Sequence, residues 1–160
     1  MCRILLLYEH ESLGGPPGIV RSVARGAERA GAEVRMRTMA DAGRQDIRWA
    51  DALALAIGGN RLPSEVKAWL DALGFSGWRA LRDKRGCVFT ADPMREDGSV
   101  RAVRSAVHLL AARGMHIVPA GELGLEQPSA DSDGAAIGHA LATRLAERRP
   151  PAVARMSRTG

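Results

Sequence analysis

A glycine-rich loop near the N-terminus has the residue types of a phosphate-binding turn. The stretch YEHESLGGPPGIV, residues 8–20, follows an apolar run and leads into a helical pattern, with Gly14 and Gly15 at its centre. Backbone N–H groups at the start of a helix and the helix dipole both favour an anion, so Leu13–Gly15 could hold a phosphate. Ser12 adds a hydroxyl. A second interpretation remains open, in which the glycines only turn the chain into the helix.

Other residues of the same loop oppose an anion. Glu9 and Glu11 carry negative charge, and Pro16 and Pro17 have no N–H to donate. A phosphate in this turn would be repelled by Glu11 unless that side chain turns away. His10 could donate a proton to a bound molecule or bind a metal, although a solvated loop histidine is the simpler interpretation.

The rest of the chain carries no sequence signature of a metal site or of a hydrolase. It has no CxxC, HExxH or GxSxG motif, and no GxGxxG opens the first helix, which disfavours an ordinary NAD site of the Rossmann type. We interpret Cys2 and Cys87 as reduced, buried thiols. The histidines at 108 and 116 are expected to be structural, and His139 to lie on a helix surface.

Short apolar runs alternate with helical patterns along the chain. Apolar residues recur three and four positions apart in the helical patterns, and glycines at 31, 74 and 114 are expected to end three of them. The connector 41–49 is polar and is predicted to lack a regular element. The predicted strands are 3–8, 33–37, 52–57, 86–90 and 115–119, and the predicted helices are 18–30, 63–73, 100–112 and about 133–148.

This alternation predicts an α/β fold with a parallel sheet and helices on both faces. Ligands of such sheets bind at the carboxyl ends of the strands. Three loops are expected there, at residues 9–17, 58–63 and 91–98.

Composition indicates one globular domain. The chain has 160 residues, of which 46% are hydrophobic, and we assign the domain to 1–147 and a flexible basic tail to 148–160. The formal net charge is +5, but arginines are spread among acids and no basic block stands beside aromatics, so no nucleic-acid partner is expected. No apolar run reaches the roughly 20 residues of a membrane helix, so no membrane partner is expected. The N-terminus is typical of a first strand and not of a signal peptide, so we expect the cytoplasm.

Several stretches together resemble a known family. They are ARGAERAGAEVRMR (24–37), WADALALAIG (49–58), LPSEVKAWLD (62–71), LAARGMHIVP (110–119) and QPSADSDGAAIGHALATRLAE (127–147). The chain resembles flavodoxin-like proteins, and among them the FMN-dependent NAD(P)H:quinone oxidoreductases of the tryptophan-repressor-binding-protein type. The resemblance covers about residues 3–147. It implies a flavodoxin-like three-layer sandwich whose five-stranded parallel sheet has the order 2-1-3-4-5.

The resemblance also implies an FMN site at the ends of the first, third and fourth strands. Arg61 is the large group left to lie against the flavin ring, and Arg113 stands where family members often carry a histidine near the flavin. With Arg61, it could stabilise the reduced flavin anion. The candidate cofactor-binding residues are His10, Ser12, Leu13, Gly14, Gly15, Gly59, Asn60, Arg61, Leu62, Thr90, Ala91, Asp92 and Arg113.

The cofactor loops depart from the family pattern. The first loop has acids where hydroxyls are expected, and the second, IGGNRLP, is about two residues shorter and lacks a Pro-Thr pair. The third, TADPMREDGS, is acidic, and Asp92 before proline is better explained as a turn-capping residue than as a catalytic carboxylate.

Three functions therefore remain, and the least favoured of them is an enzyme that binds another anionic ligand in the same crevice. The first is an FMN-dependent oxidoreductase that takes electrons from NAD(P)H and passes them to a small-molecule acceptor such as a quinone, with no catalytic side chain assigned. The second is a flavodoxin-fold protein that no longer binds flavin and acts as a binding or regulatory module. A homodimer is expected at most.

Overall fold

The computed structural model of the chain describes residues 1–9, 18–57, 62–90, 97–119 and 133–147. Five parallel strands form one sheet in the order β2-β1-β3-β4-β5. They are β1 (Arg3–Tyr8), β2 (Glu33–Thr38), β3 (Ala52–Ile57), β4 (Arg85–Thr90) and β5 (His116–Ile117). The strand order confirms the one implied by the family resemblance.

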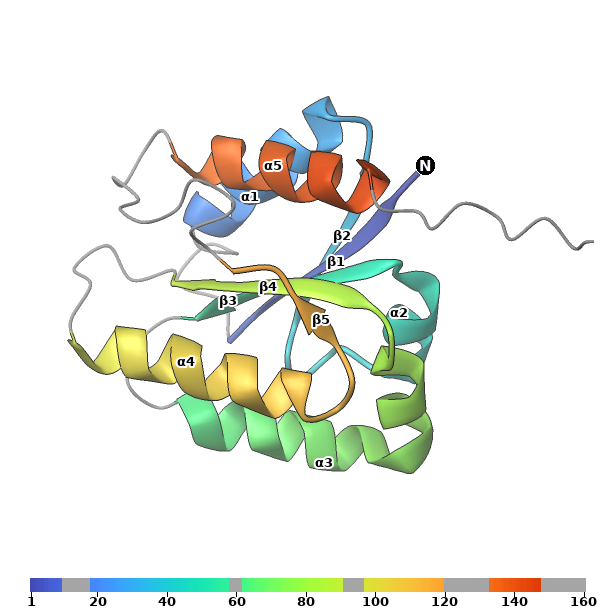
Figure 1. Cartoon of the computed structure of the whole chain (residues 1–160), viewed down its shortest axis with the longest axis vertical. Coiled ribbons are helices and arrows are strands. Elements are labelled where there is room, and N and C mark those ends of the chain that lie inside the picture. The colour runs from blue at the N-terminus through green and yellow to red at the C-terminus, as the bar shows by residue number, and fades with distance from the viewer. Residues whose placement is uncertain (10–17, 58–61, 91–96, 120–132, 148–160) are drawn as a thin grey trace, which may run out of the picture.

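Helices cover both faces of this sheet, which confirms the three-layer arrangement (Figure 1). On one face lie α1 (Gly18–Arg29) and α5 (Asp133–Glu147). On the other lie α2 (Arg44–Trp49), α3 (Leu62–Leu81) and α4 (Asp97–Ala111). None of the helices in the described ranges is long and apolar enough to cross a membrane.

The central strands are apolar because both of their faces are covered. β3, with the sequence ALALAI, is buried at every residue. In β1 successive side chains point to opposite faces, as the pleat of a strand requires. Leu5 and Leu7 join the apolar core under α2, α3 and α4, whereas Leu6 and Tyr8 join the core under α1 and α5. This alternation decides which way the residue after β1 points.

Glycine allows α1 and α5 to touch backbone to backbone. A Cβ on Gly26 of α1 would collide with the carbonyl oxygen of Ala135, and one on Gly138 of α5 would collide with the carbonyl oxygen of Val23. Gly134 fits against Ser22, where a Cβ would come within 2.7 Å of the Ser22 Cβ. No side chain fits between the helices at these points, so their separation is set by the main chain.

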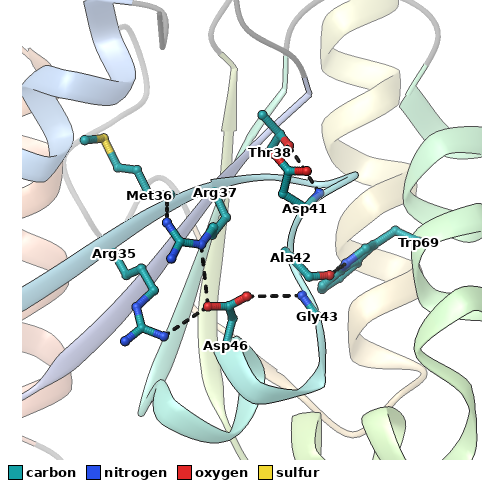
Figure 2. A network of polar contacts seen from close by, with 9 residues as sticks. All are labelled: Arg35, Met36, Arg37, Thr38, Asp41, Ala42, Gly43, Asp46 and Trp69. Atoms are coloured by element: carbon teal, nitrogen blue, oxygen red, sulfur yellow. Dashed lines mark hydrogen bonds and ion pairs between the residues drawn. The ribbon is translucent and has the colours of Figure 1, made fainter.

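The prediction that residues 41–49 lack a regular element is wrong, because they contain α2. This helix has six residues and buries Ile47 alone, so it shows no apolar periodicity in the sequence. A polar network holds it instead (Figure 2). Asp46 accepts a hydrogen bond from the Gly43 N–H at 3.2 Å and from Arg35 at 3.0 Å. The guanidinium of Arg35 also lies 4.1 Å from the centre of the Trp49 ring.

Two other boundaries differ from those predicted. Gly74 interrupts the helix as expected, with φ 64°, but the chain resumes helical turns and α3 runs on to Leu81. The last strand was predicted over 115–119, and ladder pairing with β4 covers only His116–Ile117. That strand lies at the edge of the sheet, where a single neighbour supplies its hydrogen bonds.

The α1–α5 contact gives a direct test of this packing. We expect Gly138→Ala to lower the free energy of unfolding by at least about 2 kcal/mol, because the new methyl group meets a main-chain carbonyl that cannot move aside. Urea unfolding followed by circular dichroism measures the change. Gly18→Ala is the matched control, since its Cβ would meet nothing within 4 Å. Equal stability of the two variants would contradict the backbone contact.

Candidate functional site

The candidate site lies at the carboxyl edge of the sheet. β1, β3 and β4 are parallel and in register there, with Tyr8 beside Ala56 and Ile57 beside Thr90. The ends of the three predicted loops are therefore held close together by neighbouring strands. Helices α1, α3 and α4 begin at the same edge, after those loops (Figure 1).

Most of the predicted cofactor residues lie on these loops. Thr90 is described, and it is the half-buried last residue of β4 at the candidate edge. Leu62 is the first residue of α3. Ten other candidates fall outside the described residues: His10, Ser12, Leu13, Gly14, Gly15, Gly59, Asn60, Arg61, Ala91 and Asp92.

The start of α1 favours an anion. Its first turn, Gly18–Arg21, contains no acidic residue, and Arg21 is exposed there. A Cβ placed on Gly18 would meet no described atom within 4 Å, so no described side chain covers this helix end. The first N–H groups of a helix have no partner within the helix, and the helix dipole places partial positive charge beside them.

Glu9 lies on the opposite face of the sheet from α1. It continues the alternation of β1, in which Leu5 and Leu7 face α2, α3 and α4. In keeping with this direction, Glu9 is half-buried and lines a cavity of about 550 Å³ with residues of the β2–α2 loop and of α3. One of the two carboxylates that opposed an anion in the sequence therefore points away from the start of α1.

Arg113 does not lie with the other candidates, and the structure corrects its predicted placement. α4 starts at the candidate edge and runs away from it, so Arg113, two residues after its end, lies at the amino edge. The adjacent Gly114 accepts a hydrogen bond from the Asp83 N–H at 2.9 Å, just before β4 begins. The Arg113 guanidinium lies 4.2 Å from the centre of the Trp78 ring. Within this chain Arg113 stacks on α3 and is removed from the predicted flavin contacts.

The perturbed thiols and charges lie away from the candidate edge. Burial raises the pKa of the Cys87 thiol to about 12, as expected for an inert core cysteine. Burial and then the charge of Asp51 raise the pKa of Cys2, which is half-buried; neither cysteine is in a disulfide. Burial alone would raise the pKa of Asp51, but hydrogen bonds and charge from Arg3 hold it below its usual value. These residues belong to the core and the amino edge.

The described residues contain no group of three or more histidine, cysteine, aspartate or glutamate side chains that could hold a metal ion. His116 lies in β5 and is exposed, and His139 is exposed on α5 as predicted. What the candidate edge does present is a helix start suited to an anion, framed by the ends of three parallel strands.

Solved structures share this architecture. A flavodoxin from the domain Archaea superposes with a TM-score of 0.65 and 11% identity, covering 90% of this chain and 99% of its own. A WrbA-like flavodoxin from Agrobacterium tumefaciens superposes with a TM-score of 0.62 and 20% sequence identity. The match covers 92% of this chain and 96% of that protein. FerB from Paracoccus denitrificans, a flavoenzyme NAD(P)H:(acceptor) oxidoreductase, superposes with a TM-score of 0.66 and 14% sequence identity. The match covers 92% of this chain and 96% of FerB.

No protein-family model and no curated protein matches the sequence. The structural neighbours nevertheless match along nearly the whole chain. The order β2-β1-β3-β4-β5 is also the strand order of the flavodoxin-like fold. The protein therefore has the flavodoxin-like fold. At these identities, the similarity concerns the fold.

The new position of Arg113 predicts a structural role for it. We expect Arg113→Met to lower the free energy of unfolding by up to about 1 kcal/mol, because it removes the guanidinium from the face of Trp78. Thermal unfolding and Trp78 fluorescence measure the loss. Arg104→Met, at an exposed position of α4, should leave both unchanged. An Arg113 variant as stable as the parent would contradict the stacking.

Proposed function

We propose that the protein binds FMN at the carboxyl edge of its sheet and acts as an oxidoreductase. The observation that carries the proposal is the start of α1, which lies at that edge with no acid in its first turn and with Glu9 on the other face of the sheet. The FMN phosphate would occupy this helix start, where N–H groups and the helix dipole favour its charge. The similarity in fold to flavodoxins and to the flavoenzyme FerB supports the same assignment.

The residues of the three loops have separate roles in this proposal. The N–H groups of Leu13, Gly14 and Gly15 would hold the phosphate, helped by Ser12 and His10. Gly59, Asn60, Arg61 and Leu62, and Thr90, Ala91 and Asp92, would bind the ring. Arg61 adds positive charge beside the ring, which favours the reduced anionic flavin.

Bound FMN would supply the hydride and electron chemistry, and the protein would bind, orient and tune it. We propose NAD(P)H as the reductant and a quinone or similar small molecule as the acceptor. The similarity in fold to FerB, a flavoenzyme NAD(P)H:(acceptor) oxidoreductase, supports this choice by analogy. A cytoplasmic location and a homodimer belong to the same proposal.

The first experiment is the visible spectrum of the purified protein, followed by titration with FMN and with riboflavin. We expect FMN to bind at least about tenfold more tightly than riboflavin, because riboflavin lacks the phosphate that makes charge-assisted hydrogen bonds to the helix start. Quenching of flavin fluorescence measures both affinities. Consumption of NADH or NADPH with a quinone then tests the oxidoreductase activity.

A colourless protein that binds neither FMN nor riboflavin would contradict this proposal. The alternative function, a binding or regulatory module that keeps the fold without the cofactor, would then stand. Equal affinity for FMN and riboflavin would contradict the phosphate site while leaving a flavin site elsewhere on the protein.

The role of Arg61 has its own test. Arg61→Ala should weaken FMN binding by roughly fivefold, because it removes a positive charge and a planar group from beside the ring. Arg29→Ala is the control, since Arg29 is exposed in the last turn of α1, at the far end from the candidate edge. Unchanged FMN affinity in the Arg61 variant would remove this residue from the site.

A further inference from the structure

The cavity lined by Glu9 lies on the face of the sheet away from α1. It has a volume of about 550 Å³ and opens between the β2–α2 loop and the first half of α3, with Glu9 from the end of β1 contributing to its lining. Figure 2 shows how the loop is held against α3, through the hydrogen bond from the Trp69 indole N–H to the Ala42 carbonyl at 3.1 Å. Thr38 and Asp41 brace the same loop with a hydrogen bond of 2.9 Å.

The walls of this cavity are largely apolar. Trp69 and Leu73 come from α3 and are buried in the core, and Met39 lies opposite them on the loop. Four of the lining residues are alanines, whose small side chains leave room for a guest molecule: Ala40, Ala42, Ala68 and Ala72. The volume lies within the range of roughly 300–1,000 Å³ that is typical of small-molecule sites.

The charged side chains of the described lining decide which ligand charge the cavity attracts. Glu9 is half-buried, and Glu65 is exposed on α3. Arg44, the first residue of α2, is exposed and is the one cation among the described lining residues. Neither Glu65 nor Arg44 forms an ion pair within 4 Å with another residue in the described ranges. The described part of the lining therefore carries one more acidic than basic side chain, beside an apolar wall.

We propose that this cavity binds a small organic cation, an apolar body that carries a protonated amine. The apolar body packs against Trp69, Met39 and Leu73, where its burial is favourable. The amine pairs with Glu9 at the inner end of the site and with Glu65 at the α3 wall. A partly desolvated carboxylate attracts a cation more strongly than a carboxylate in bulk water does.

Arg44 sets the specificity of this site by charge. It repels an amine and would attract a carboxylate, so its removal should improve binding of the cation. The cation site can form without bound FMN, because Glu9 and the start of α1 lie on opposite faces of the sheet. Failure of one proposal therefore leaves the other standing.

Three phenylalkyl probes of similar length separate charge from apolar packing: 4-phenylbutylamine, 4-phenylbutan-1-ol and 4-phenylbutyrate. Each is titrated into the full-length protein labelled with nitrogen-15, and the three tryptophan indole N–H signals are followed. Trp69 lines the cavity, whereas Trp49 packs under Arg35 and Trp78 under Arg113, so they are internal references. Trp69→Phe assigns the Trp69 signal.

We expect the amine to shift the Trp69 signal and to bind about fivefold or more tightly than the alcohol, with the carboxylate weakest. Glu9→Gln should weaken the amine about fivefold and leave the alcohol unchanged. Arg44→Ala should tighten the amine about twofold to threefold. Opposite effects of these two variants on one probe would identify the charges that select the ligand.

A blocking variant keeps the test decisive if Glu9→Gln does not fold. Ala68 is exposed at the cavity, so Ala68→Phe fills the cavity from the solvent side without disturbing the core, and binding of the amine should be lost. Ala136→Phe, at an exposed position of α5, is the matched control and should bind like the parent.

Three results would overturn the proposal. They are an amine that leaves the Trp69 signal in place, an amine that binds no better than the alcohol or the carboxylate, and unchanged amine binding in the Ala68 variant.

Discussion

The contact between the main chains of α1 and α5 constrains the rest of the molecule. Gly26 and Gly138 each meet a carbonyl oxygen of the facing helix, so neither position has space for a Cβ. A side-chain interface can adjust by changing rotamers, but two backbones in contact cannot. α1 therefore has a fixed place over β1 and β2, and its first turn has a fixed place at the carboxyl edge. Any anion held by the N–H groups of that turn depends on this distance.

The alternation of β1 then divides the functional residues between two faces. Leu6 and Tyr8 pack under α1 and α5, while Leu5 and Leu7 pack under α2, α3 and α4. The next residue, Glu9, follows this alternation and lies on the α3 side. A shift of one residue would exchange both sets of apolar side chains and bring the carboxylate beside the helix start. The apolar core thus determines where the charge at the strand end points.

Much of the fold could be predicted from the sequence, because buried parallel strands are continuously apolar and helices show a period of three to four residues. β1 and β3 are clear for this reason. α2 could not be found in the same way, since its stability comes from Asp46, Arg35 and the Trp69–Ala42 hydrogen bond, which join residues far apart in the sequence. The continuation of α3 beyond Gly74 was likewise hidden, because a glycine with positive φ ends most helices.

The site was less predictable than the fold. The resemblance placed Arg113 near a flavin because family members often carry a histidine at this point of the chain. The direction of α4 instead places Arg113 at the amino edge, against Trp78. The cavity gave no signal in the sequence at all. Its described walls come from three separate segments of the chain. Its alanines are ordinary helix and loop residues in the sequence, and only the fold shows that they line the same cavity as Met39 and Trp69.

The two proposed ligands have opposite charges and would lie on opposite faces of one strand. At a separation of about 10 Å and an effective dielectric constant of about 20, two opposite unit charges attract by roughly 1.7 kcal/mol. A cation beside Glu9 also neutralises a carboxylate at the very end of the strand that leads into the phosphate loop. Each ligand would therefore strengthen binding of the other, and linkage requires the two effects to be equal. The sign of this coupling follows from the alternation of β1 alone, since a carboxylate on the α1 side would instead compete with the phosphate for the same helix start.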